Sequence, residues 1–278
     1  MELSKDKWTE ELNLIKPRVK NLFYKGNVDL LVNDSPKLAI VGSRRMSDYG
    51  KRVIEKWMPE LVNKGIIIVS GFMYGVDQAA HKACVENGGK TIAVLGYGID
   101  RKIAADDEKL YQNILQVDSL ILSEYPGVTD ATRATFPARN RIVAGISDAV
   151  LVIEAAEKSG SLITARLAQQ FKKPLMALPG RIDVGVAKGT NDLIKNGKAR
   201  MVSSLNDVLE VMNLAKGVEG AKVKVNDPIL NLLKDGEKSV DELSRILRMN
   251  IDELNQKLMI LTLQGEVVET SGKYSVVL

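Results

Sequence analysis

Two residue types that carry much of protein chemistry are nearly absent from this sequence, which has one cysteine, Cys84, and one histidine, His81, among 278 residues. A single cysteine excludes an internal disulfide framework and a cysteine-based zinc site, so Cys84 is interpreted as a small hydrophobe packed in a helix. His81 has no carboxylate or thiol at ligand spacing. We therefore interpret it as a polar helix residue and not as a general base.

Long apolar runs are also missing. No run approaches the ~20 residues that a membrane span needs, and the N-terminus, MELSKDKWTE, lacks the apolar core of a signal peptide. With 45% apolar and 27% charged residues, the composition is ordinary for a soluble protein, and the length suits one α/β domain with a small appendage. Together these features predict a cytoplasmic location.

The net charge of +4 is unevenly distributed along the chain. Residues 226–278 carry nine acidic and six basic residues, a net charge of −3, which leaves +7 for residues 1–225. If a polyanion binds, we expect it to bind the larger, basic part of the chain. The C-terminal part has the wrong sign of charge for a phosphate backbone.

From residue 38 onward, short apolar runs alternate with amphipathic stretches. Near-continuous apolar runs are typical of strands that are covered on both faces, as in a parallel sheet. The predicted strands are residues 38–41, 66–70, 91–95, 119–123, 149–153 and 174–178, and the predicted helices are residues 49–63, 76–87, 106–116, 140–146 and 162–171. This order predicts an α/β fold with a Rossmann-like, doubly wound, mainly parallel sheet. Ligands of such sheets bind outside the carboxyl ends of the strands.

The segments that flank this alternation complete the predicted domain organisation. Residues 1–37 form a lead-in, with a helix near the start and an extended stretch around 22–25, that packs on the main domain, residues 38–214. The main domain ends with a helix near 204–214, and residues 215–225 are a linker. Residues 226–278 form a winged helix. Its predicted parts are helices 228–233, 240–247 (capped by Ser239) and 251–264 (capped by Asn250), and a hairpin of 266–269 with 274–277.

Glycine-rich or polar segments follow the predicted strands. Glycine permits a sharp turn and a close approach to a ligand, and a helix start can hold a phosphate on its amide groups. The segments are Gly42-Ser43-Arg44-Arg45, residues 70–77 and 96–100, residues 123–127, Glu154 with residues 158–165, and Pro179-Gly180-Arg181 with residues 189–194. Each alone could be a tight turn. Together at one sheet edge, with an excess of arginine and lysine and no metal-ligand set, they predict a phosphate-binding rim.

Residues 136–145 are the densest of these regions. They begin Phe136-Pro137-Ala138-Arg139-Asn140-Arg141, Arg133 lies three positions upstream, and no acidic residue lies between Asp130 and Asp148. A ring beside guanidinium groups is the usual arrangement for holding single-stranded nucleic acid, by base stacking and phosphate pairing. We therefore predict that Phe136 contacts a nucleic acid, with an ordinary core ring as the alternative.

Taken in order, these segments resemble the DNA-processing protein A family, DprA, also called Smf. The resemblance covers residues 20–214, and the small winged helix of the family is similar to residues 226–278. The motifs are Gly42-Ser43-Arg44, Ser70-Gly71 with Gly75-Val76-Asp77, Gly96-x-Gly98-x-Asp100, Ser123-Glu124-Tyr125-Pro126, Phe136-Pro137-x-Arg139-Asn140-Arg141-Ile142, Glu154, Ser159-Gly160-Ser161-Leu162-x-Thr164-Ala165, Pro179-Gly180 and Asn191-x-Leu193-Ile194.

The resemblance implies a protein without enzymatic activity or cofactor. Such a protein protects incoming single-stranded DNA and loads the RecA recombinase onto it during natural transformation, and it forms a homodimer. Phe136 would stack on a base, while Arg44, Arg133 and the Ser159 loop hold phosphates. Carried onto this chain, the implied DNA contacts are Ser43, Arg44, Arg133, Phe136, Arg139, Asn140, Ser159 and Gly160.

Two other functions stay open from the sequence. Nucleoside-monophosphate phosphoribohydrolases place a glutamate beside a phosphate loop, and Glu154 would be the candidate here, although their Pro-Gly-Gly-x-Gly-Thr-x-x-Glu signature is missing. Otherwise Glu154 is a structural carboxylate paired with a nearby arginine. The winged helix could instead bind DNA as a regulator, but its net charge of −3 favours contact with protein.

Overall fold

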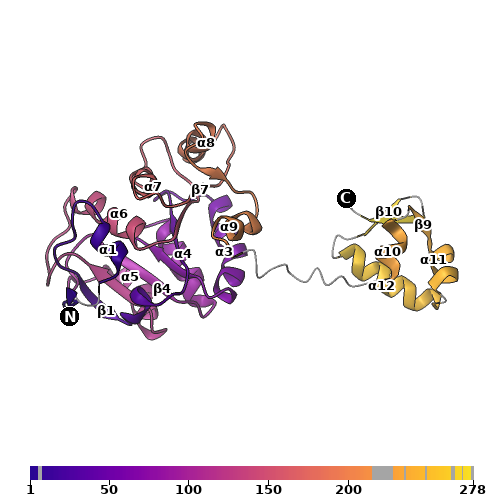
Figure 1. Ribbon diagram of the computed structural model, residues 1–278, viewed down its shortest axis with the longest axis horizontal. Helices are drawn as coiled ribbons and strands as arrows, with labels where there is room; N and C mark the ends of the chain where they lie inside the picture. The colour runs from indigo at the N-terminus through magenta and orange to yellow at the C-terminus, as the bar shows by residue number, and fades with distance from the viewer. Residues whose placement is uncertain are drawn as a thin grey trace. The chain divides into compact units, whose positions relative to one another are not determined.

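The computed structural model describes residues 1–5, 8–214, 228–234, 236–247, 249–263, 267–270 and 272–276. The chain divides into two compact units, Met1–Ala215 and Lys216–Leu278 (Figure 1). Each unit encloses buried apolar clusters of its own. The predicted linker, residues 215–225, lies outside the described residues.

An eight-stranded sheet forms the centre of the first unit. Its strands are β1 (Phe23–Gly26), β2 (Lys37–Val41), β3 (Ile67–Ser70), β4 (Thr91–Leu95), β5 (Leu120–Ser123), β6 (Ala149–Val152), β7 (Leu175–Ala177) and β8 (Arg200–Met201). They lie in the order β1-β5-β4-β3-β2-β6-β7-β8, and every neighbouring pair is parallel except β1 with β5. The chain adds strands first on one side of β2 and then on the other, so the strand order reverses there. Such a reversal opens a crevice at the carboxyl ends of the strands.

Helices cover both faces of the sheet (Figure 1). On one face lie α1 (Glu10–Leu14), α6 (Thr135–Gly145) and α7 (Ser161–Gln170). On the other lie α3 (Asp48–Asn63), α4 (Val76–Glu86) and α9 (Leu205–Val211). The remaining elements are α2 (Asp29–Val32), α5 (Ala105–Gln116), the 3₁₀ helix η2 (Gly185–Ala187) and α8 (Lys188–Lys195). Strands β2 to β7 are buried along their whole length, which accounts for their continuous apolar sequence and confirms the predicted fold class.

Some helices and strands differ from the prediction. α6 begins at Thr135 and not at residue 140, so Phe136 and Arg139 both lie on this helix. Pro137 falls in the first helical turn, where the missing amide hydrogen leaves no helix hydrogen bond unmade, so the proline does not delay the start. The 3₁₀ helix η2, helix α8 and strand β8 have no counterpart in the prediction. They are short, and both residues of β8 are exposed, so no apolar run marks them.

The second unit contains three helices and a small antiparallel sheet in its described residues. Its elements are α10 (Pro228–Lys234), β9 (Lys238–Ser239), α11 (Val240–Leu247), α12 (Ile251–Leu263), β10 (Val267–Thr270) and β11 (Lys273–Val276). The predicted helices and hairpin are present, whereas β9, which pairs with β11, was unexpected. Ser239 begins α11 as predicted: its hydroxyl accepts from the amide of Glu242, whose carboxylate accepts from the amide of Ser239. Across the described part of the chain, none of the helices has the length and apolar content that crossing a membrane requires.

His81 lies on α4, as expected, but it is completely buried. Its Nδ1 lies 2.7 Å from the hydroxyl of Thr91, and that hydroxyl donates to the carbonyl of Ile68. The hydroxyl must therefore accept from the ring, which fixes the tautomer with the proton on Nδ1. Burial, helped by the positive charge of Arg139, lowers the pKa of His81 to about 3. The ring is thus held neutral in the folded protein.

This burial predicts an acid-dependent loss of stability. Between pH 6.5, the ordinary pKa of the ring, and about 3, the unfolded chain binds a proton at His81 that the folded chain does not bind. Lowering the pH through this range therefore favours unfolding, by at most about 1.4 kcal/mol per pH unit. In urea titrations at a series of pH values, His81→Phe should lose less stability than the wild type as the pH falls. Parallel pH profiles for the two proteins would contradict this account.

Candidate nucleic-acid interface

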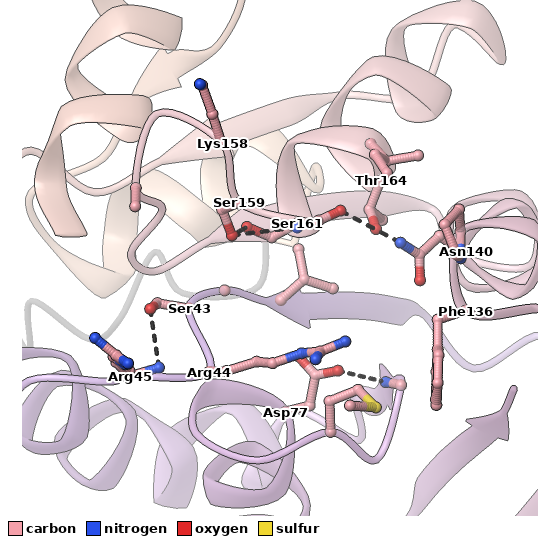
Figure 2. Close-up of a pocket in the computed structure, with 18 of the residues that line it drawn as sticks. Ser43, Arg44, Arg45, Asp77, Phe136, Asn140, Lys158, Ser159, Ser161 and Thr164 are labelled. Carbon is pink, nitrogen blue, oxygen red and sulfur yellow. Dashed lines mark hydrogen bonds between the residues drawn. The ribbon is translucent and has the colours of Figure 1, made fainter. Parts of the chain in front are cut away.

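A pocket of about 940 Å³ opens at the carboxyl edge of the sheet, where the strand order reverses (Figure 2). It is lined by the loops that follow β2, β3, β5 and β6, by residues 184–186 at η2, and by the first turns of α6 and α7. All eight predicted contact residues line it, although not all of them with an accessible side chain. They are Ser43, Arg44, Arg133, Phe136, Arg139, Asn140, Ser159 and Gly160.

The loop after β2 is held by main-chain contacts. The amide of Ser43 donates to the carbonyl of Glu154 over 2.7 Å, and the amide of Arg45 donates to the Ser43 hydroxyl. Gly75 makes room for this loop, because a Cβ at its φ of +81° would lie 2.3 Å from the Ser43 carbonyl oxygen. The loop is therefore fixed while the side chains of Arg44 and Arg45 remain exposed.

Phe136 faces Arg44 at the start of α6. The guanidinium carbon of Arg44 lies 5.7 Å from the centre of the half-buried Phe136 ring, within the range of a cation–π contact (Figure 2). The ring also lies against Gly96, where an added Cβ would come within 2.8 Å of the ring carbon Cδ1. Backbone on one side and an arginine on another hold the ring in place at the pocket.

Arg139, one helical turn further along α6, points into the protein. Its side chain is 2% exposed, and its Nη1 donates to the main-chain carbonyls of Gly71 and Val94. Nε donates to the Oδ1 of Asn140 over 3.1 Å. These bonds direct the guanidinium to protein atoms, so the sequence-based assignment of Arg139 as a DNA contact has to be revised. The reason is the helical start at Thr135, which turns residue 139 toward the sheet.

Asp77 balances this buried charge from α4. Its Oδ2 accepts from the amide of Gly71 over 3.2 Å. Burial raises the pKa of Asp77 to about 6, against the opposite influence of Arg139 and of its hydrogen bonds. Burial also lowers the pKa of Arg139, against the opposite influence of Asp77. The two groups thus depend on each other for compensation of charge.

The loop before α7 supplies a second anchoring surface. The hydroxyls of Ser159 and Ser161 are 2.8 Å apart, and the amide of Asn140 donates to the carbonyl of Gly160 over 3.3 Å. Lys158 projects from the same loop and is exposed (Figure 2). α7 begins at Ser161, and its N-cap residue, Gly160, makes no side-chain cap hydrogen bond. Both residues line the pocket, so the positive end of the helix dipole lies there.

The exposed charged side chains that line the pocket are all positive. Arg44, Arg45, Arg133 and Lys158 are exposed at its lining, and in the part of the chain that the structure describes the sole acidic lining residue is the buried Asp77. Sequence reasoning placed Arg45 and Lys158 in the loops without assigning them contacts, although their position beside Arg44 and Ser159 was the available signal. Among the described residues, no group of three or more histidine, cysteine, aspartate or glutamate side chains could hold a metal ion.

Glu154 lies behind the pocket and is not among the residues that line it. Its carboxylate is buried and accepts from both the amide and the hydroxyl of Ser47, the N-cap residue of α3. The sequence left two roles open for Glu154, catalysis or pairing with an arginine. The structure gives it a different partner, Ser47, which no sequence pattern had marked. The carboxylate therefore fixes the start of α3.

Comparison with known proteins relates the chain to one family. A model described as DNA recombination-mediator protein A matches residues 1–213. The chain is 46% identical to DNA processing protein DprA of Streptococcus pneumoniae over 188 residues, which cover 68% of this chain and 65% of the relative. It is 39% identical to Protein Smf of Escherichia coli over 189 residues, which cover 68% of this chain and 50% of the relative. The match thus spans about half to two thirds of these relatives.

Two solved structures are similar in fold and sequence. DprA from Streptococcus pneumoniae has a TM-score of 0.69 and 40% identity, with 76% of this chain and 73% of that chain covered. DprA from Helicobacter pylori, whose structure concerns its single-stranded DNA binding mode, has a TM-score of 0.69 and 33% identity. There the similarity covers 78% of this chain and 96% of that chain.

The Arg139–Asp77 arrangement predicts strong coupling in stability. Arg139→Met should lower the free energy of unfolding by about 3–5 kcal/mol at a pH well above 6, because it leaves the buried Asp77 carboxylate uncompensated. Adding Asp77→Asn should restore part of this loss, since both charges are then removed. Urea unfolding of the two single variants and the double variant measures the coupling. Additive losses would show that the two side chains do not compensate each other.

Proposed function

The chain belongs to the DNA recombination-mediator protein A family, and from this premise we propose that it binds single-stranded DNA in the pocket at the carboxyl edge of its sheet. The observation that carries the proposal is the stack of Arg44 on Phe136 inside a pocket bordered by exposed cations. A ring with guanidinium groups around it is suited to bases that can leave their stack and to phosphates.

In this proposal the contacts divide by chemistry. A base stacks on Phe136, while Arg44, Arg133 and the loop of Ser159 and Gly160 hold phosphates on either side of it. Ser43 and Asn140 shape the loops that meet the backbone, and Arg139 positions α6 from beneath. Because the Phe136 ring is half-buried within the pocket, a splayed base can reach it but a paired base in a duplex cannot. The proposed ligand is therefore single-stranded.

The wider role follows from the family resemblance. We propose that the protein has no enzymatic activity and that it protects incoming DNA and loads the RecA recombinase onto it during natural transformation, as a cytoplasmic homodimer. Binding without chemistry is supported by the positions of the two most reactive candidates. Neither residue lines the pocket: Glu154 is hydrogen-bonded to Ser47, and His81 is buried with its ring held neutral.

The first test separates phosphate contact from stacking. Arg44→Ala should weaken binding of an oligothymidylate by on the order of 1–3 kcal/mol, the range of a lost charge-assisted hydrogen bond. It should also reduce the salt slope by about 0.7 per lost phosphate contact. Phe136→Ala should weaken binding by about 1–3 kcal/mol through lost stacking, with the salt slope unchanged. Fluorescence anisotropy at several salt concentrations measures both quantities.

Lys64→Ala provides the control for this test. Lys64 follows the last turn of α3, so it lies at the opposite edge of the sheet from the pocket. Its removal lowers the net charge equally but should leave both affinity and salt slope near the wild-type values. The assignment of the pocket fails if Arg44→Ala binds as tightly as the wild type.

The second test concerns the C-terminal unit, which we propose is a winged helix that contacts protein. Its net charge of −3 over residues 226–278 opposes contact with a phosphate backbone. A chain ending at residue 214 should therefore bind oligothymidylate within about twofold of the full chain, with the same salt slope. A large loss of affinity in the shortened chain would transfer DNA binding to the C-terminal unit.

A further inference from the structure

A second stack of a guanidinium on a ring lies close to the first. Arg101 is placed over Tyr97, with its guanidinium carbon 5.4 Å from the ring centre. Tyr97 directly follows Gly96, the residue against which Phe136 rests. The Tyr97 ring packs on a buried apolar cluster with α5, so it holds Arg101 from below. The Arg101 side chain is 40% exposed and presents its other side to solvent.

Arg101 also borders a second hollow, of about 590 Å³. Its polar and charged lining residues are Lys25 from β1, Arg101 and Lys102 from the loop after β4, and Glu108, Tyr111 and Gln112 from α5. Lys25 pairs with Asp100 over 3.1 Å, and Gln112 donates to Glu108. Lys102 forms no ion pair with any residue that the structure describes.

The loops that border the two hollows are joined by main-chain hydrogen bonds. The amides of Gly98 and Asp100, after β4, donate over 2.8 Å to the carbonyls of Thr129 and Gly127, after β5. Arg101 pairs with Asp130 over 3.2 Å, and Asp130 is followed by the segment 131–133 that lines the Phe136 pocket. Arg101 therefore borders the second hollow and pairs with the residue that directly precedes the 131–133 lining of the Phe136 pocket.

The ion pair of Arg101 does not block a ligand. Asp130 is 86% exposed, and exposed ion pairs contribute little because water and salt screen them. A phosphate can replace Asp130 as the partner of Arg101, and Lys102 adds an exposed cation that forms no ion pair within the described residues. The stack on Tyr97 holds the guanidinium flat in advance, which reduces the ordering needed on binding.

We propose that a single strand bound at Phe136 continues across the loop after β4 into this second hollow. There a base stacks on the exposed face of Arg101, and Arg101 and Lys102 hold the following phosphates. The inference rests on the proposed function, because it assigns a second contact region to the same DNA strand. It predicts that the residues matter only for a strand long enough to leave the pocket.

The test compares oligothymidylates of about six and about sixteen nucleotides, the range of site sizes that single-strand binding folds occupy. For the longer strand, the full-length variant R101A/K102A should bind about tenfold more weakly, with a salt slope lower by about 1.4, or 0.7 for each of two phosphates. For the shorter strand its affinity should stay within about twofold of the wild type. Unchanged thermal unfolding confirms that the exposed substitutions leave the fold intact.

Two further variants serve as the controls for this comparison. K64A/K82A removes two cations toward the C-terminal ends of α3 and α4, at the opposite sheet edge, and should affect neither strand. R44A should weaken both strands. If R44A weakens both and R101A/K102A weakens neither, or both equally, the second contact region is refuted and the proposed function stands. If R44A weakens neither strand, the proposed function itself fails.

Discussion

The interaction on which the rest of the pocket depends is the burial of the Arg139 guanidinium. From α6 it reaches the carbonyls of Gly71 and Val94, and so joins the ends of β3 and β4 to the helix that carries Phe136 one turn earlier. Gly71 must be a glycine here, since a Cβ would lie 2.6 Å from the guanidinium and 2.7 Å from the Asp77 carboxylate. A buried charge is unfavourable unless it is compensated, and Asp77 compensates it. The fixed guanidinium sets where the Phe136 ring stands.

A second fixed point, on the other side of β2, is Glu154. Its main-chain carbonyl accepts from the amide of Ser43, and its carboxylate accepts from Ser47. Glu154 alone therefore fixes both the position of the Arg44 loop and the start of α3. Arg139 acts on the half of the sheet made by β3 and β4, and Glu154 acts on the half that begins with β6. The pocket lies where the two halves separate, so Phe136 and Arg44 meet there although their positions are 92 residues apart in sequence.

The sequence predicted the sheet, the loops and the family, but it did not predict the direction in which individual side chains point. Buried parallel strands leave continuous apolar runs, which is why β4 was predicted with both ends correct. The predicted start of α6 was too late, because Pro137 resembles a helix boundary. With residue 139 placed before the helix, the inward direction of the Arg139 side chain was not predicted. The partner of Glu154 could not be inferred either. Ser47 is 107 residues away and became its partner only through the order of strands in the sheet.

The arginines around Phe136 show how burial separates two functions of one residue type. In sequence Arg133, Arg139 and Arg141 form a single basic cluster, yet Arg139 and Arg141 are buried and Arg133 is exposed. Arg141 pairs with Glu124 over 2.6 Å and donates to the carbonyl of Pro17, so it fastens the N-terminal segment to α6. A guanidinium already bonded to protein releases no counterion when a phosphate arrives, and its removal acts through the fold. Affinity for a polyanion therefore depends on the outward cations, and its geometry depends on the inward ones.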